Sequence, residues 1–315
     1  MNIGIDIGGT NIGAGLVNGD LNIIHRIEIP TNKHRGYDFV ESQIIHIIEE
    51  MMSKASEEGE KIDSIGIGIP GIADKSGDRV IYCTNLNWAN VFLGKNLRRR
   101  FNVSINIEND ATVAGIAEAA LGVSRGYSNS VFITLGTGIG GGIIINNKVY
   151  TGGRGIGSEV GHTIVGKNFY DCNCGNNGCL ETFASSTAIL KYTRKEIEAG
   201  FTDTMLLEKV EGIDEIDTRL IFDCAKLGDK LSNNAVDRMV KYLTIGIVNI
   251  INTIDPDIIV IGGGMAKAGE FFLDKIKNLI PKYILFKEMD YGEIKLAGLG
   301  NDAGIIGAAM LNKYK

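Results

Sequence analysis

The sequence predicts an α/β fold built from two similar domains. Apolar runs typical of strands are followed by segments with helical spacing, and this order starts again near residue 130. Most clusters among the 42 glycines follow an apolar run, where a ligand can approach the backbone closely. The 315 residues are enough for two domains. We expect these domains to face each other across a cleft.

The best candidate for a domain boundary is the stretch 122–129, although no low-complexity linker separates the halves. We therefore expect an N-terminal domain at 1–121 and a C-terminal domain at 122–301 that carries the cysteine loop. A last helix, at about 302–315, is expected to pack back on the N-terminal domain.

In the first third of the chain, short apolar runs with turns between them predict strands, and apolar residues at helical spacing predict helices. Asp110 is the expected N-cap of the second helix. The expected strands are Met1–Ile7, Asn11–Val17, Leu21–Ile29, Ser64–Ile69 and Val103–Ile107, and the expected helices are Phe39–Lys54 and Asp110–Leu121.

The remainder of the chain repeats this alternation of strands and helices. The expected strands are Ser130–Leu135, Gly142–Ile145, Ile258–Ile261 and Ile294–Ala297. The expected helices are Ala184–Ala199, Asn233–Thr253, one that ends at Ile280, and Asp302–Leu311.

The composition narrows the class of protein. Hydrophobic residues make up 44% and charged residues 22%, as in ordinary globular proteins. A net charge of −6 argues against a nucleic-acid partner, and no apolar run approaches the 18 residues of a membrane span. The N-terminus lacks the basic and apolar regions of a signal peptide, so we expect a cytoplasmic protein.

Three cysteines and one histidine lie in one short, glycine-rich stretch: His162, Cys172, Cys174 and Cys179. Zinc favours four nitrogen or sulfur ligands in a tetrahedron. Free or disulfide-bonded cysteines in a loop are the alternative, but nothing in the sequence indicates an oxidising compartment. A closed site with four protein ligands is structural, so we expect a metal that holds this loop rigid.

Two glycine-rich turns that follow strands have the size of phosphate-binding turns. Their backbone N–H groups can face phosphate oxygens, and Thr10 and Asn11 can add side-chain donors. Asp6, at the end of the first strand, can hold Mg²⁺ directly or through water. A plain hairpin turn is the alternative for the Gly-Gly turn alone. Two matches to G-x-G-x-x-G lack a convincing following helix, and no P-loop motif occurs.

Asn109 and Asp110 lie between an expected strand and an expected helix. An aspartate there can accept a hydrogen bond from a substrate hydroxyl and take its proton as the oxygen attacks phosphorus. An ordinary capping aspartate is the alternative. Glu159, His162 and Glu181 flank the cysteines, and carboxylates with an imidazole on a rigid loop suit the vicinal hydroxyls of a sugar. Surface carboxylates without function are common, so each of these residues alone is a weak indication.

In combination, these motifs resemble the ROK family of sugar kinases, whose name stands for repressor, open reading frame, kinase. The resemblance covers essentially the whole chain, and the cysteine segment is its most specific part. The matching segments are Asp6-Ile-Gly-Gly-Thr-Asn11, Glu108-Asn-Asp-Ala111, Gly136-Thr-Gly-Ile-Gly-Gly-Gly142, Glu159-Val-Gly-His162 and Cys172-Asn-Cys-Gly-Asn-Asn-Gly-Cys179-Leu-Glu181.

The resemblance implies the actin-like, ribonuclease H-like fold of hexokinases, with ATP and sugar in the cleft between two α/β domains. It implies that Asp110 is the catalytic base toward the 6-hydroxyl of a hexose. The implied sugar contacts are Gly71, Asn85, Asn109, Asp110, Glu159, His162 and Glu181. ATP and Mg²⁺ would be held by Asp6, Gly8, Gly9, Thr10, Asn11, Gly136, Thr137, Gly138 and Gly263. Structural Zn²⁺ would be bound by His162, Cys172, Cys174 and Cys179, with the second ring nitrogen of the histidine free to reach a hydroxyl.

Glucose is the favoured substrate, because glucose kinases of the family usually carry this cysteine cluster and the Glu-x-Gly-His motif. Kinases for N-acetylmannosamine, N-acetylglucosamine, fructose and allose share the motifs and remain alternatives, as does polyphosphate as the phosphoryl donor. A homodimer or homotetramer is expected.

Two other classes of protein remain. A sugar-responsive transcriptional repressor of the family carries a helix-turn-helix ahead of the first strand, which here begins near residue 2. An actin-like ATPase without a small substrate would not need the cysteine loop.

Overall fold

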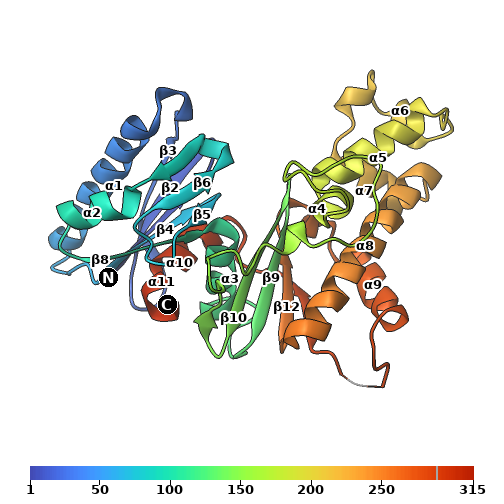
Figure 1. The fold of residues 1–315 in the computed structure, drawn as a ribbon. Coiled ribbons are helices and arrows are strands. Elements are labelled where there is room, and N and C mark those ends of the chain that lie inside the picture. The colour runs from blue at the N-terminus through green and yellow to red at the C-terminus, as the bar shows by residue number, and fades with distance from the viewer. Residues whose placement is uncertain (289) are drawn as a thin grey trace. The chain divides into compact units, whose positions relative to one another are not determined.

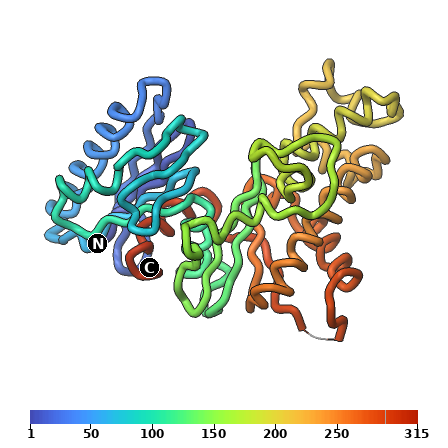
Figure 2. The backbone as a smooth tube through the Cα atoms, viewed as in Figure 1, coloured from blue at the N-terminus to red at the C-terminus, as the bar shows by residue number. Residues whose placement is uncertain are grey.

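The structure, a computed structural model, describes residues 1–288 and 290–315 (Figure 1). Unit 1 comprises Met1–Phe132, Gly142–Ser158 and Gly298–Lys315, and unit 2 comprises Ile133–Gly141 and Glu159–Ala297. In Figure 2 the red C-terminal segment lies with the blue N-terminal segments of unit 1. The two units are not continuous in the sequence. The domain limits expected from the sequence, 1–121 and 122–301, remain a prediction.

Unit 1 contains a five-stranded mixed sheet with the order β3-β2-β1-β4-β8. Strands β1, β2 and β3 are antiparallel, whereas β4 and β8 run parallel to β1. The carboxyl ends of β1, β4 and β8 therefore meet at one edge, where Asp6 is in register with Gly68, and Gly68 with Glu108. The strands are β1 (Asn2–Ile7), β2 (Asn11–Val17), β3 (Ile23–Pro30), β4 (Ser64–Ile69) and β8 (Ser104–Asn109).

Helices cover this sheet. The apolar face of α1 is buried, and α10 packs on β1 and β4. Only glycine fits at Gly4 and Gly66, since a Cβ there would collide with the backbone oxygens of Ile305 and Ala308. The helices of unit 1 are α1 (Tyr37–Glu57), α2 (Leu93–Arg100), α3 (Asp110–Ala120), α10 (Ala303–Ala309) and α11 (Leu311–Tyr314).

A small antiparallel sheet with the order β5-β6-β7 also belongs to unit 1 and was not expected from the sequence. Its strands are β5 (Ile72–Ala73), β6 (Val80–Cys83) and β7 (Trp88–Val91), and the short 3₁₀ helix η2 (Thr84–Leu86) joins the last two. This sheet positions two expected sugar contacts, because Gly71 precedes β5 and Asn85 lies in η2.

The second large sheet has the order β11-β10-β9-β12-β13, and β9 and β10 each contribute residues to both units. Its strands are β9 (Ser130–Leu135), β10 (Ile139–Ile145), β11 (Lys148–Val149), β12 (Ile258–Gly262) and β13 (Glu293–Leu296). The long helix α8 packs against α4, α5, α7 and α9 within unit 2. The helices are α4 (Glu181–Ala184), α5 (Ser186–Glu198), α6 (Met205–Glu208), α7 (Thr218–Lys226), α8 (Lys230–Ile254) and α9 (Glu270–Leu279).

The expected elements are present with small shifts at their ends. The helix expected at Ala184–Ala199 is split into α4 and α5 at Ser185, whose side chain caps α5. Among the described residues, no helix has both the length and the hydropathy of a membrane-spanning segment.

Candidate active site

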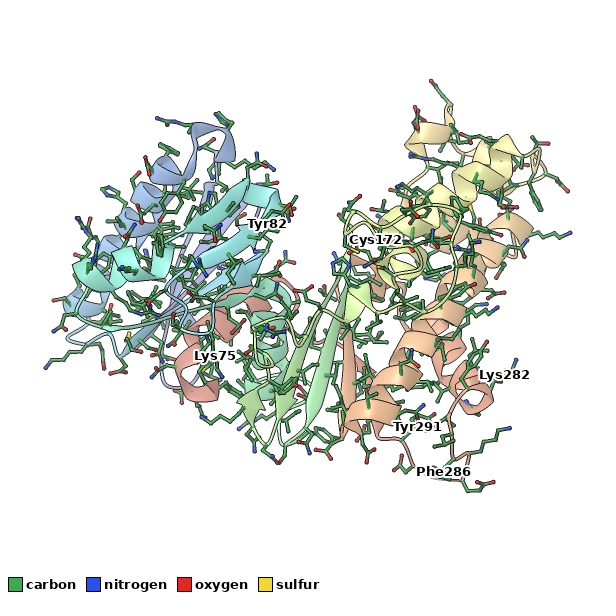
Figure 3. All side chains as sticks on the ribbon, in the orientation of Figure 1. Lys75, Tyr82, Cys172, Lys282, Phe286 and Tyr291 are labelled. Carbon is green, nitrogen blue, oxygen red and sulfur yellow. The ribbon has the colours of Figure 1, made fainter. Side chains whose placement is uncertain are left out.

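The histidine and the three cysteines of unit 2 lie together. The ligand atoms of His162, Cys172, Cys174 and Cys179 are all within 4.8 Å of one another, and Figure 3 labels Cys172 in this loop. His162 Nδ1 lies 3.6 Å from Cys172 Sγ, and the sulfurs of Cys174 and Cys179 are 3.5 Å apart. In a tetrahedral site with bonds of about 2.3 Å to sulfur, neighbouring ligand atoms lie about 3.8 Å apart. The spacing therefore fits a single zinc ion.

The chemistry of the thiols agrees with a cation site. All five cysteines are free. Burial raises the pKa of Cys172, and it raises the pKa of Cys179 to about 12. The backbone N–H of Asn176 holds the pKa of the exposed Cys174 down at about 7. Two buried thiols thus resist ionisation without a cation, and a bound divalent ion would hold all three as thiolates.

Glu181 joins this cluster to the second glycine-rich turn. Its Oε2 accepts a hydrogen bond from the Ile139 N–H at 2.9 Å, and its Oε1 lies 4.0 Å from Cys172 Sγ. A Cβ at Gly138 would collide with the same carboxylate. The cluster and the turn of unit 2 are therefore held next to each other by one side chain.

The Gly136–Gly138 turn is closed by backbone and side-chain contacts within unit 2. The Gly136 N–H donates to the Gly138 carbonyl at 3.0 Å, and the Thr187 hydroxyl donates to the Thr137 carbonyl at 2.8 Å. Gly263 has a φ of +86°, and a Cβ there would collide with the Leu135 carbonyl. The expected nucleotide residues of unit 2 thus form one glycine-lined surface at the ends of β9 and β12.

Glu159 directly precedes the short 3₁₀ helix η3 (Val160–His162), and His162 is its last residue. The His162 N–H donates to the Glu159 carbonyl at 3.1 Å. A Cβ at Gly161 would collide with the Ile139 carbonyl, so the Glu-Val-Gly-His loop lies directly against β10. Since Nδ1 of His162 faces Cys172, Nε2 is the ring nitrogen left for a substrate hydroxyl.

In unit 1, Asn109 and Asp110 lie at the start of α3. Asn109, and not the expected Asp110, is the N-cap, because its Oδ1 accepts from the N–H groups of Ala111 and Thr112 at 2.9 and 3.3 Å. The Asn109 Nδ2 donates to the Gly71 carbonyl at 3.2 Å. Asp110 is the first helical residue, and its Oδ1 accepts from the Ala111 N–H at 2.8 Å. Both side chains are therefore oriented by the helix end.

The first glycine-rich turn connects β1 to β2. The Gly8 N–H donates to the Asn11 carbonyl at 2.8 Å, and the Thr31 hydroxyl donates to the Gly8 carbonyl at 2.7 Å. The Asn11 side-chain amide is already bonded to Glu28 Oε1 at 2.8 Å. Thr10 is exposed. The turn has the hairpin geometry that the alternative interpretation also predicts.

Asp6, at the end of β1, places a carboxylate next to this turn. None of the described residues donates a hydrogen bond to its carboxylate, and burial raises its pKa. A Cβ at Gly304 would collide with its Oδ2, so the carboxylate packs tightly against α10. A half-buried carboxylate that accepts no hydrogen bond from the protein is less favourable as an anion than an exposed one. These properties fit a residue that holds Mg²⁺, directly or through water.

Two residues near these groups were missed by the sequence reasoning. The Lys33 Nζ donates to the Asn85 carbonyl at 2.8 Å and would lie 3.8 Å from a Cβ at Gly9, so it places a cation beside the first turn. The Arg238 guanidinium of α8 donates at 2.7 Å to Oδ1 of Asn168, which lies in the chain between His162 and Cys172. Nothing in the spacing of either residue indicates these contacts, which depend on the fold.

Comparison with known proteins defines the family. Residues 2–315 match the ROK family. A glucokinase of Thermotoga maritima is 35% identical over 99% of this chain and 97% of its own length. The crystal structure of a ROK family glucokinase from Streptomyces griseus in complex with glucose and AMPPNP has a TM-score of 0.80 and 30% identity, covering 98% of both chains.

The chain therefore belongs to the ROK family and has the two-domain, actin-like α/β fold of hexokinase-type enzymes. Among the members of this family, the similarity to glucokinases places it with the sugar kinases. Repressors of the family are also similar: a xylose repressor of Caldicellulosiruptor bescii is 34% identical over 84% of this chain and 66% of its own length.

Proposed function

We propose that this protein is an ATP-dependent hexokinase that phosphorylates glucose at the 6-hydroxyl, with Asp110 as the catalytic base. The observation that carries this proposal is the pair at the start of α3. Asn109 is fixed by the Gly71 carbonyl and by two backbone N–H groups, and it holds the next residue, Asp110, at the helix end. A carboxylate fixed in this way can orient a hydroxyl and accept its proton, which is the main demand of phosphoryl transfer on a protein side chain.

The remaining expected residues have complementary roles in this proposal. Asn85, Glu159, His162 and Glu181 would bind other hydroxyls of the hexose. Gly71 would shape the same site, because it lets the backbone pass close to β6, where a Cβ would collide with the Tyr82 carbonyl and with Cys83. The turns at Gly8–Asn11 and Gly136–Gly138, with Gly263, would receive the phosphates of ATP. Asp6 would hold Mg²⁺, which neutralises phosphate charge when bound.

The cysteine cluster would hold structural zinc. In this proposal the metal orients the His162 ring through Nδ1, so that Nε2 faces the sugar, and it fixes the loop from which Glu181 projects. A homodimer or homotetramer stays a prediction from the family.

The base assignment is tested with Asp110→Asn. The variant keeps an oxygen that can accept the Ala111 N–H but cannot take a proton. We expect the Kd for glucose to change less than about threefold, and kcat to fall by roughly 10²- to 10⁴-fold. Asp38→Asn, in the first turn of α1, is the matched control and should leave both unchanged. Turnover close to that of the unaltered enzyme would rule out Asp110 as the base.

The substrate is tested with a coupled kinase assay over glucose, mannose, fructose, N-acetylmannosamine and N-acetylglucosamine, with ATP or polyphosphate as the donor. We expect the highest kcat/KM for glucose with ATP. A higher kcat/KM for an N-acetyl sugar than for glucose would show that the N-acetyl sugar is the preferred substrate. ATP hydrolysis that ignores all added sugars would argue for an actin-like ATPase.

A further inference from the structure

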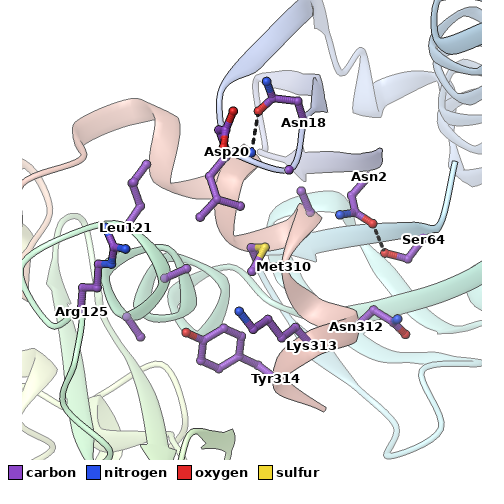
Figure 4. A pocket seen from close by; sticks show the side chains of 15 residues that line it. Asn2, Asn18, Asp20, Ser64, Leu121, Arg125, Met310, Asn312, Lys313 and Tyr314 are labelled. Atoms are coloured by element: carbon purple, nitrogen blue, oxygen red, sulfur yellow. Dashed lines mark hydrogen bonds between the residues drawn. The ribbon is translucent and has the colours of Figure 1, made fainter. Parts of the chain in front are cut away.

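Unit 1 contains a cavity of about 760 Å³ that none of the roles above uses (Figure 4). Asn2 and Ser64, at the first residues of β1 and β4, line it together with the last residues of α3, α10 and α11. It therefore lies at the amino ends of these strands, whereas Asp6 and Asn109 lie at the carboxyl ends. Its volume is in the range of small-molecule sites.

Two cationic side chains line this cavity among its polar groups. Arg125 and Lys313 are exposed and line it, and no acidic side chain in the described part of the chain pairs with either. Figure 4 shows the Lys313 and Tyr314 side chains extending toward the side where Arg125 lies. Asp20 is the one acidic residue of the lining. In a chain of net charge −6, two unpaired cations against one carboxylate make this a locally positive site.

The Tyr314 hydroxyl adds a neutral donor. Its ring is buried, and burial raises the pKa of the phenol, so the hydroxyl stays protonated. Leu21, Leu121 and Met310 supply an apolar part of the lining. The cavity thus combines a cationic side for an anionic group with an apolar surface for a small carbon skeleton.

We propose that this cavity is a binding site for a small organic phosphate monoester, whose phosphate is held by Arg125 and Lys313. Arginine and lysine are the usual partners of phosphate oxygens, and a guanidinium can bind two of them at once. The site is independent of the proposed kinase activity. The ligand is a phosphate on a carbon skeleton of a few atoms.

Titrations followed by amide resonances in ¹H–¹⁵N NMR spectra test this proposal. The probes are inorganic phosphate and glycerol 3-phosphate, with glycerol and matched sodium chloride as controls. We expect both phosphate probes to shift the amides of 19–21, 125 and 312–314 saturably. Glycerol 3-phosphate should bind more tightly than inorganic phosphate because of the apolar lining. Phosphate bound at the Gly8–Asn11 turn would shift different amides.

Variants that remove positive or negative charges from the cavity lining test the role of charge in binding. The double variant Arg125→Gln/Lys313→Gln should weaken binding about tenfold or more, because two charge-assisted contacts are lost. Asp20→Asn should tighten it about two- to fivefold, since a repelling carboxylate is removed. Lys75→Gln/Arg99→Gln is the matched control: both residues are exposed in unit 1 and lie outside the cavity lining, and this variant should bind as the original does.

Three results would overturn the proposal. One is the absence of saturable shifts at these amides with either phosphate probe. Another is an equal response to sodium chloride, which would show general screening. The third is unchanged binding in the double variant, or weaker binding in Asp20→Asn.

Discussion

At the scale of single residues, the ionised form of Asp6 lowers the stability of the folded protein. Its carboxylate lies at the end of β1 against α10, and burial raises its pKa. A carboxyl whose pKa is higher in the folded than in the unfolded chain binds protons more readily when folded. Its contribution to stability therefore falls as the pH rises from the ordinary value of 3.8 through the raised pKa. At neutral pH the anion is a source of instability that a bound cation would relieve.

The variant Asp6→Asn should change stability and activity in opposite directions. Without metal or nucleotide, we expect the variant to have a higher free energy of unfolding than the original at pH 7, because a half-buried, partly desolvated carboxylate is replaced by a neutral amide. The difference should shrink as the pH falls toward 4, where the original carboxyl is protonated. We expect kcat with ATP and Mg²⁺ to fall by roughly 10- to 100-fold, as for other groups that support a metal.

Urea unfolding between pH 4 and 8 and Mg²⁺-dependent kinase assays measure these effects. Asp63→Asn, an exposed aspartate paired with the N-terminal amine, is the control. A variant that is less stable at pH 7, or that keeps normal Mg²⁺ dependence, would contradict this role of Asp6.

At the scale of elements, the loop of unit 2 between η3 and α4, residues 163–180, is held by two groups of contacts. The four possible metal ligands lie on one side. On the other side Arg238, from α8, donates to Asn168, and Asn168 Nδ2 donates to the Thr182 carbonyl at 2.6 Å. Backbone hydrogen bonds within the loop, such as the Leu180 N–H to the Thr163 carbonyl at 2.8 Å, act together with these two anchors to position Glu181.

Metal removal should loosen this loop. We expect the purified protein to contain one zinc ion per chain, and stripping it with a chelator should lower the melting temperature by roughly 5–10 °C. The KM for the hexose should rise more than the KM for ATP, because Glu159, His162 and Glu181 lie on this segment. Elemental analysis, melting curves and steady-state kinetics measure these quantities.

Cys174→Ser should reproduce the metal loss, whereas Asn173→Ala, an exposed neighbour between two ligands, should retain the metal. A protein that binds no zinc in its purified state and after zinc addition would refute the assignment.

The contacts of Arg238 lead to a separate prediction about the free energy of unfolding. Its guanidinium lies 4.8 Å from the Phe183 ring and 4.9 Å from the Tyr192 ring, and burial lowers its pKa. Arg238→Met should reduce the free energy of unfolding by about 2–3 kcal/mol, because Asn168 Oδ1 loses its charged donor and the planar stacking is lost. Arg238→Lys should recover only part of this loss. Lys241→Met, exposed on the same helix, should cost less than about 0.5 kcal/mol. Equal effects of the 238 and 241 variants in urea unfolding would argue against the anchor.

These elements show which parts of the structure were predictable. Strands such as β1, β2, β4 and β9 were predicted because they are buried apolar runs, and the metal ligands because they lie within one short segment. The strands of the β5-β6-β7 sheet have two to four residues, too few for a periodic pattern. Arg238 and Lys33 escaped prediction because their partners, Asn168 and Asn85, are distant in the sequence, and only the fold brings them together.

At the scale of the whole molecule, the chain leaves unit 1 after Phe132 and again after Ser158, and it re-enters this unit at Gly142 and at Gly298. Glu118, near the end of α3, binds two connecting segments of unit 1: the one that follows α3 and the one that begins at Gly298. Its Oε2 accepts from the Val123 N–H at 2.9 Å, and its Oε1 accepts from the N–H groups of Gly298 and Leu299 at 2.9 and 3.0 Å. Its side chain is buried, although in the sequence it resembles any helical glutamate.

Glu118→Gln tests whether this carboxylate secures the two connections. In either orientation the new amide turns an NH₂ group toward a backbone N–H, so at least one donor loses its acceptor in a buried site. We expect the free energy of unfolding to fall by about 1–3 kcal/mol. Hydrogen exchange should accelerate at the amides of Val123, Gly298 or Leu299, and Glu118→Ala should enlarge both effects. Glu60→Gln, exposed and distant in the chain, should change neither. If the exchange of these three amides were unaltered in Glu118→Gln, the two connections would not depend on Glu118, and the backbone hydrogen bonds around them would suffice.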